Sequence, residues 1–308
     1  MKRIVRTVVT AALATLALGC SKNNSNSSIE SANTKSIIGG TDVAEGTTLQ
    51  KSIVGIFDVE RNALCTGSLI ENNVVLTAAH CIGRLPQNHV IIFGSDMISI
   101  LTSNDIKFAL AHLRPGVKTV VNPEWNDGRQ GDKAWGDTAL IKFEGPLPEG
   151  YAPAKMLAPN SLAEGATVVV AGYGVNSDIV KAVDPKDHAD FNDKVKSGEF
   201  FCELSEDGKS TGKCFQETLS GEGHLRTTEL TLLGAYNDTE VVFDQQHGKA
   251  SCEGDSGGPA YLMVNGEYHL FGVTSRGGRG CNTLVVYSDV SSPKLSAWLA
   301  TAKAQLEK

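Results

Sequence analysis

The sequence predicts an all-β protein, a barrel or a sandwich, with one helix at its C-terminus. Short runs of β-branched and aromatic residues recur along the chain, turn residues separate them, and a clear helical spacing of apolar residues occurs only near the end. Hydrophobic residues make up 41% and charged residues 20% of the 308 residues, so the chain carries enough apolar material for one large domain or two smaller ones.

The expected strands are short runs bounded by Gly, Pro, Asn or Asp, which favour turns. A Gly- and Pro-rich stretch at 145–160 predicts a connector between two halves, about 37–150 and 151–290. The runs cover residues 52–59, 68–77 with a turn at Asn72-Asn73, 90–93, 138–143, 167–172, 225–233, 261–264 and 269–274.

The expected helix covers residues 292–306. Ser292 is suited to the N-cap and Pro293 to the first turn. One face of this helix is apolar and predicts burial against the body: Leu295, Trp298, Leu299, Ala302 and Leu306.

Residues 178–223 differ from the rest, since they are polar, charged and rich in Gly. They contain Cys202 and Cys214, which are close along the chain. We expect a long loop closed by a local disulfide.

The N-terminus has the pattern of an export signal over residues 1–19. Positive residues precede an apolar stretch, 7–18, that is too short to span a bilayer. Residues 20–36 are dominated by Ser and Asn and predict a flexible tether or pro-segment. We therefore expect an exported protein.

Cys20 follows the apolar stretch directly and resembles the lipid-bearing cysteine of bacterial lipoproteins. The alternative is ordinary signal cleavage that leaves an unpaired cysteine. The chain has seven cysteines, so lipid on Cys20 would leave six for three disulfides in an exported protein. We favour the lipoprotein, in the periplasm or cell envelope, or secreted after cleavage.

The overall charge disfavours nucleic-acid binding. The net charge is −7, and the positive leader makes the remainder more acidic still, which repels phosphate backbones. The histidines are scattered without zinc-ligand spacing, so we expect neither a metal nor another cofactor.

Three segments carry residues suited to nucleophilic catalysis. They are Leu76–Cys81 with His80, Asp137–Leu140 with Asp137, and Cys252–Pro259 with Ser256. A serine hydroxyl needs an imidazole to accept its proton, and an aspartate must hold that imidazole in the correct tautomer. The glycines around Ser256 favour main-chain N–H groups aimed at an oxyanion, with Gly254 and Ser256 as the expected donors.

These three segments, in this order, resemble the trypsin/chymotrypsin family of serine endopeptidases. The resemblance covers about residues 37–303. It implies two six-stranded antiparallel barrels with the cleft between them, and His80 and Asp137 in the first barrel and Ser256 in the second. It also implies a monomer that cuts proteins or peptides.

The resemblance extends to further residues. It pairs Cys65 with Cys81 and Cys252 with Cys281, while Cys202 and Cys214 have no counterpart in the family. Ser275 matches the residue that hydrogen-bonds the aspartate, and Gly277 the segment that pairs with an extended substrate.

Ile37-Ile38-Gly39-Gly40 resembles the N-terminus that the family exposes on activation. The amine freed at Ile37 would pair with Asp255. We expect cleavage between Ser36 and Ile37, by another protease or by the enzyme itself, because a Ser replaces the usual Lys or Arg at that site.

The residues expected to bind the substrate side chain are Ala250, Ser251, Ser275, Gly277 and Val285. Ala250 matches the pocket floor and carries no charge, so cleavage after Lys or Arg is disfavoured. A Val at 285 implies a shallow pocket for small apolar side chains. Arg276 and Arg279 either attract acidic substrate residues or are solvated loop charges.

Two other functions fit parts of the sequence. A non-catalytic homologue would act as a binding or regulatory module. Gly254–Gly258 also matches the G-x-S-x-G elbow of α/β-hydrolase esterases, but no acid and histidine follow in the order that fold requires.

Overall fold

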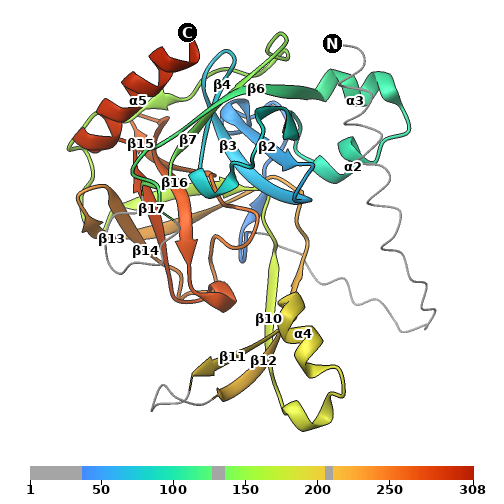
Figure 1. The fold of residues 1–308 in the computed structure, drawn as a ribbon. Coiled ribbons are helices and arrows are strands. Elements are labelled where there is room, and N and C mark those ends of the chain that lie inside the picture. Colours follow the sequence, from blue (N-terminus) through green and yellow to red (C-terminus); the bar gives the residue numbers. More distant parts are fainter. Residues whose placement is uncertain (1–36, 127–135, 205–210) are drawn as a thin grey trace.

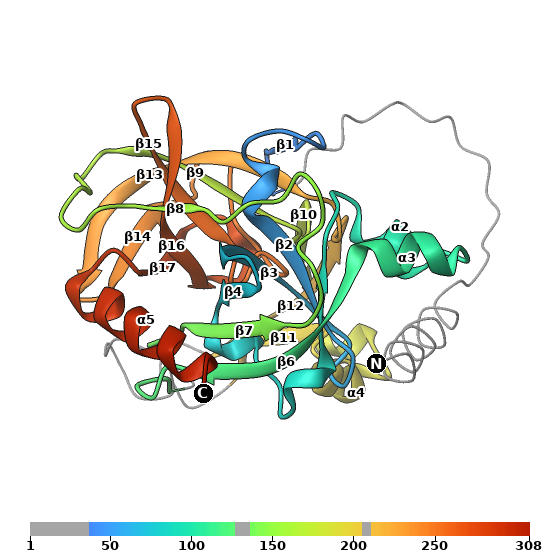
Figure 2. The same cartoon turned by 90° about the horizontal axis from the view of Figure 1, so that it is seen from above.

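The protein consists of two β-barrels side by side, with a helix across one end and a small sheet projecting from the body (Figures 1 and 2). The computed structural model describes residues 37–126, 136–204 and 211–308. The expected signal segment 1–19, the tether 20–36 with Cys20, and Ser36 lie outside the described residues.

The first barrel is a closed antiparallel sheet of six strands in the order β2-β3-β4-β7-β6-β5. The hairpin β3–β4 turns at Asn72-Asn73, as the sequence predicted. Its strands are β2 Ile53–Asp58, β3 Ala63–Glu71, β4 Val74–Thr77, β5 His89–Ile92, β6 Leu113–Val121 and β7 Ala139–Phe143.

The second barrel also has six strands, because β13 pairs with both β14 and β9 and so closes the order β13-β14-β17-β16-β15-β9. Its strands are β9 Thr167–Gly172, β13 Arg226–Asn237, β14 Glu240–Asp244, β15 Pro259–Val264, β16 Glu267–Gly277 and β17 Leu284–Asp289. Two short strands add to it: β1 Thr41–Asp42 pairs with β13, and β8 Lys155–Met156 lies parallel to β16. The two six-stranded antiparallel barrels are therefore confirmed.

Each barrel encloses an apolar core. In β2 all six residues are buried, because one side of the strand faces the barrel interior and the other is covered by neighbouring elements. One cluster fills the first barrel and continues to the C-terminal helix, and a second, which includes Ile37, fills the second barrel.

The C-terminal helix α5, Pro293–Leu306, is confirmed. The Ser292 hydroxyl caps it by accepting the N–H of Leu295 at 3.4 Å. Four of the five predicted apolar positions are buried and Trp298 is partly buried against the first core.

The prediction of a loop for residues 178–223 is wrong. This segment forms a three-stranded antiparallel sheet, β10-β12-β11, with a helix on one side: β10 Ser177–Val183, α4 Phe191–Ser197, β11 Phe200–Leu204 and β12 Thr211–Ser220. We call residues 177–220 the insertion. The expected disulfide joins Cys202 and Cys214, which are cross-strand partners.

Several short elements were not predicted from the sequence. β6 contains Pro115 and Gly116, two residue types that are rare in strands. α2 and α3 are helices of only five and seven residues, with Asp96 and Asp105 as their N-caps. They are α2 Met97–Leu101 and α3 Ile106–His112, with the 3₁₀ turns η1 Gln50–Ser52, η2 Ala79–Cys81, η3 Pro86–Asn88, η4 Pro185–Asp187 and η5 Arg279–Cys281. Within the described ranges, no helix has the length and apolar character needed to cross a membrane.

Candidate active site

His80 lies on the η2 turn that follows β4, and two separate contacts hold this turn. The disulfide Cys65–Cys81 ties the turn to β3. The Arg61 guanidinium donates to the main-chain carbonyls of His80 and Cys81, while its Nε donates to the buried carboxylate of Asp58 at 2.6 Å. The imidazole is about one-third exposed.

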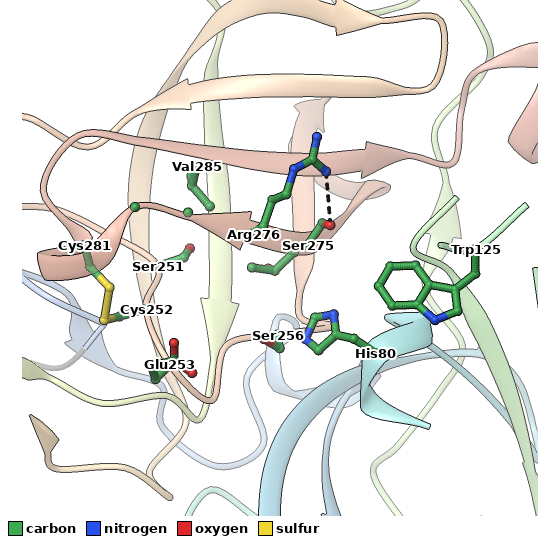
Figure 3. A pocket seen from close by; sticks show the side chains of 13 residues that line it. His80, Trp125, Ser251, Cys252, Glu253, Ser256, Ser275, Arg276, Cys281 and Val285 are labelled. Atoms are coloured by element: carbon green, nitrogen blue, oxygen red, sulfur yellow. Dashed lines mark hydrogen bonds between the residues drawn. A yellow bond between two sulfur atoms is a disulfide. The ribbon is translucent and has the colours of Figure 1, made fainter. Parts of the chain in front are cut away.

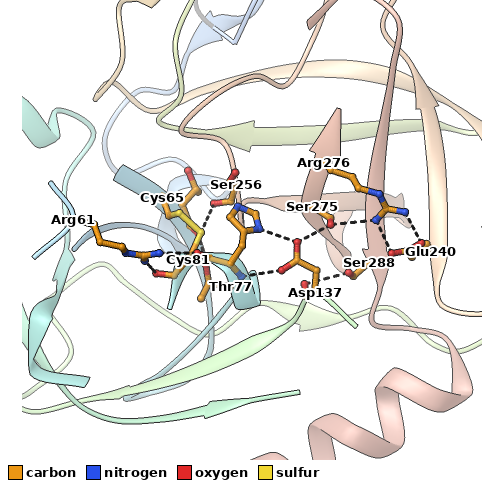
Figure 4. Close-up of polar contacts among 12 residues, drawn as sticks. Arg61, Cys65, Thr77, Cys81, Asp137, Glu240, Ser256, Ser275, Arg276 and Ser288 are labelled. Carbon is orange, nitrogen blue, oxygen red and sulfur yellow. Dashed lines mark hydrogen bonds and ion pairs between the residues drawn. A yellow bond between two sulfur atoms is a disulfide. The ribbon is translucent and has the colours of Figure 1, made fainter. Parts of the chain in front are cut away.

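Asp137 is completely buried immediately before β7 and holds His80 through two hydrogen bonds (Figure 4). Its Oδ2 lies 2.8 Å from His80 Nδ1, and its Oδ1 accepts the main-chain N–H of His80 at 3.0 Å. Nδ1 next to a carboxylate carries the proton, so Nε2 is left as the acceptor that a general base needs.

Ser275 adds a third hydrogen bond to the same carboxylate. Its hydroxyl donates to Asp137 Oδ2 at 2.7 Å. The pairing of β16 with β17 shifts between Thr274 and Arg276, so Ser275 occupies a bulge that turns its side chain toward Asp137. The predicted partner of the aspartate is thus in contact with it.

Ser256 lines the same cavity as His80, and Figure 3 shows it beside the imidazole ring. Its carbonyl accepts the N–H of Thr66, which fixes this loop to the first barrel. Among the described residues the Ser256 hydroxyl and His80 form no hydrogen bond, and such contacts commonly tighten only when substrate binds.

The turn around Ser256 depends on two glycines with positive φ. Gly254 has φ +89° and Gly257 φ +79°, and a Cβ on Gly257 would meet the Thr77 hydroxyl at 2.0 Å. The main-chain N–H groups of Gly254 and Ser256 donate to no other group in the described part of the chain. They therefore remain available to an oxyanion.

A cavity of about 390 Å³ extends from His80 along β16 (Figure 3). Four of the residues expected to bind the substrate side chain line it: Ser251, Ser275, Gly277 and Val285. Ala250 does not: it is completely buried and its N–H donates to the Ile38 carbonyl at 2.9 Å.

Sequence reasoning did not assign four of the lining residues to the site: Trp125, Glu253, Thr274 and Gly278. Trp125 lies beside His80, with ring centroids 6.3 Å apart, and Glu253 lies next to Cys252. Trp125 is four residues beyond the end of β6 and has no motif around it. Glu253 lies inside the nucleophile segment, so its position could have been inferred.

Burial of Asp255 raises the pKa of its carboxyl to about 7. The N–H groups of Cys252 and Gly174, at 2.8 and 2.9 Å, and the charge of Arg226 offset part of that rise. Ile37 is 1% exposed within the second core.

Each of the two arginines forms an ion pair within the described chain. A solvated loop charge agrees with Arg279, which is 55% exposed, but not with Arg276, which is 19% exposed, and attraction of acidic substrate residues stays a prediction. Arg276 binds the buried carboxylate of Glu240 through two hydrogen bonds of 2.7 and 2.9 Å (Figure 4). Arg279 pairs with Glu217 and lies over the Phe201 ring.

The three expected disulfides are present: Cys65–Cys81, Cys202–Cys214 and Cys252–Cys281. The described residues contain two clusters of side chains of metal-ligating type, and each includes disulfide cysteines. A cysteine in a disulfide has no thiolate to offer a metal.

The sequence model of one family, trypsin, matches residues 37–299. The chain belongs to the trypsin family. It is also similar to human chymotrypsin-like elastase family member 1, with 46% identity over 48 residues, which is 14% of this chain and 19% of that protein's length. Trypsin-family membership and the antiparallel barrels exclude the α/β-hydrolase fold, which requires a parallel sheet with an elbow between strand and helix.

Proposed function

We propose that the protein is a serine endopeptidase in which Ser256 is the nucleophile, His80 the general base and Asp137 the residue that orients His80. The observation that carries the proposal is the hydrogen-bonded series Ser275–Asp137–His80, which ends at the cavity that Ser256 lines. Family membership favours the same activity on proteins or peptides.

In the proposed reaction the Ser256 hydroxyl oxygen attacks the carbonyl carbon of a peptide bond, and its proton passes to His80 Nε2. The N–H groups of Gly254 and Ser256 bind the oxyanion. The C–N bond breaks as His80 returns the proton to the leaving amine, which leaves an acyl-enzyme. Water then attacks this ester by the same proton transfers in reverse, releasing the acid and Ser256.

We propose activation by cleavage between Ser36 and Ile37. Asp255 is fully buried with no cation in direct contact among the described residues, and Ile37 is buried in the same barrel. A new α-amino group at Ile37 would supply the positive charge that stabilises the ionised form of Asp255. The activator is another protease or a second copy of the enzyme.

We propose that the pocket prefers small apolar side chains. Val285 forms part of the cavity wall beside Gly277, its cross-strand partner in the pairing of β17 with β16. The hydroxyl of Ser251, which lines the cavity, is hydrogen-bonded to that of Tyr287, with the two oxygens 2.5 Å apart. Among the described residues that line the cavity, Glu253 alone has an acidic side chain.

We propose that the precursor is exported and that Cys20 carries lipid, so that cleavage before Ile37 also releases the enzyme from the membrane. The exported location is supported by three disulfides, which persist in oxidising compartments.

A fluorophosphonate probe tests the activity, since it labels an activated serine. We expect labelling of the processed chain at Ser256 and none of Ser256→Ala. A correctly folded chain that begins at Ile37, but neither reacts with the probe nor hydrolyses peptides, is instead a non-catalytic homologue. N-terminal sequencing of membrane and soluble pools tests the release step, and an active species that retains Cys20 would contradict it.

A further inference from the structure

The sheet of the insertion has two different faces. The register of β10, β11 and β12 places Ile179, Phe200 and the Cys202–Cys214 disulfide on one face, and α4 covers part of it through Phe191 and Lys194 against Phe200. The opposite face carries Val180, Ala182, Phe201, Phe215, Glu217 and Leu219. We call this second set the proximal face.

The proximal face is joined to the wall of the catalytic cavity. Arg279, on the η5 turn that ends at Cys281, pairs with Glu217 and stacks over Phe201 at 4.4 Å. Asp178, on the same face, lies 3.8 Å from the sulfur of Cys252. Since Cys252 and Cys281 both line the cavity, the proximal face begins where the cavity ends.

This face exposes apolar side chains that the fold does not cover. Val180 is 38% and Leu219 39% exposed, Ala182 is exposed, and Phe215 stacks on Phe201 with ring centroids 5.4 Å apart. Figure 1 shows the insertion extending away from both barrels, so these residues are not packed in either barrel core. Exposed apolar surface that continues a binding site is typical of an interaction surface.

We propose that the proximal face is a second binding site for the protein substrate, which holds an apolar, extended segment lying outside the part bound in the cavity. The proposal rests on the proposed peptidase function. The continuity through Arg279 and the Cys252–Cys281 disulfide identifies the substrate as the occupant, because a chain leaving the cavity on this side meets the proximal face directly. Short peptides that fill only the cavity do not reach it.

Removing the insertion tests the proposal in the full chain. The Asn176 N–H donates to the Ser220 carbonyl at 2.9 Å, so the two ends of the insertion meet and a Gly-Gly turn can replace residues 177–219. With unfolded casein as the protein substrate, we expect kcat/KM to fall about tenfold or more, which is the loss of about 1.4 kcal/mol of binding. Hydrolysis of a four-residue chromogenic peptide should stay within about twofold, as it depends on the cavity alone.

Adjacent residues of β10 provide a matched pair of variants that does not depend on the deletion folding. Val180→Asp places a charge on the proximal face, whereas Ile179→Asp, at a 47% exposed position, places the same charge on the other face. We expect Val180→Asp to weaken casein cleavage about fivefold to tenfold, and Ile179→Asp to leave it unchanged.

Equal effects of the two variants, or an equal loss on casein and on the short peptide, would overturn the proposal. So would a deletion variant that cleaves casein normally. These outcomes are distinct from failure of the peptidase function, in which the unmodified processed chain would cleave neither substrate and Ser256 would not react with fluorophosphonate.

Discussion

Asp255→Asn in the uncleaved chain provides a direct test of the charge balance beneath the nucleophile loop. The Asp255 carboxyl is buried with a pKa of about 7, against 3.8 for an ordinary aspartate. Ionising this carboxyl therefore costs about 4 kcal/mol more in the folded protein than in the unfolded chain. Ser256→Ala in both proteins prevents self-cleavage during the measurement.

The direction in which the free energy of unfolding changes with pH follows from the protons that each state binds. Between pH 3.8 and about 7 the folded chain holds the Asp255 proton and the unfolded chain does not, so the free energy of unfolding falls as the pH rises through that window. Of the total, about 3 kcal/mol is lost between pH 5 and pH 8. Asparagine cannot ionise, so Asp255→Asn should remove this part of the pH dependence.

Urea unfolding at pH 5 and pH 8 measures the difference between the two uncleaved proteins. A chain that begins at Ile37 should behave like Asp255→Asn, because the proposed pairing of its amine with the carboxylate would lower the pKa of Asp255. The reasoning is refuted if the uncleaved protein with Asp255 is as stable at pH 8 as at pH 5, relative to the Asn variant.

Four further variants test the site. Asp137→Asn should lower kcat by about 10⁴-fold with little effect on KM, since His80 would adopt the wrong tautomer, and steady-state kinetics of the processed enzyme measures this. Ser275→Ala removes one of three hydrogen bonds to the Asp137 carboxylate and should lower kcat about fivefold, the equivalent of about 1 kcal/mol; an unchanged kcat would contradict its positioning role. Glu240→Gln leaves the Arg276 charge without its carboxylate and should lower the free energy of unfolding by about 3 kcal/mol, as read from urea midpoints. Val285→Gly should shift cleavage of a peptide library toward larger apolar residues by about 10-fold to 100-fold per residue type, and a library profile identical to that of the unmodified enzyme would reject the proposed pocket wall.

The parts of the site that the sequence could predict are those encoded in short, specific segments. His80 follows a strand and precedes Cys81, and Ser256 stands among glycines whose positive φ the turn requires. The pairings Cys65–Cys81 and Cys252–Cys281 were implied by the family resemblance, and Cys202–Cys214 by the closeness of these two residues along the chain; all three are present. For such segments, local sequence and chemistry point to one arrangement.

The parts that escaped prediction depend on contacts between distant residues. Glu240 and Arg276 are 36 positions apart, and the sequence on either side of Glu240 does not indicate that its carboxylate is buried against an arginine. The strands of the insertion are polar and partly exposed, so their hydrophobic pattern is too weak to separate a small sheet from a loop. The burial of Ala250 behind the cavity likewise follows from its pairing with Ile38 at the other end of the chain.

The two attachments of the η2 turn would respond differently to a reducing agent. Cys65 and Cys81 are 16 positions apart. Reduction of their disulfide would lower the free energy of unfolding by about 3 kcal/mol, because the unfolded chain would gain conformational entropy. Arg61, held by Asp58, would still donate hydrogen bonds to the main-chain carbonyls of the η2 turn, so the position of the imidazole would be preserved. Loss of this disulfide would thus lower the free energy of unfolding before it changed the rate of an individual catalytic cycle.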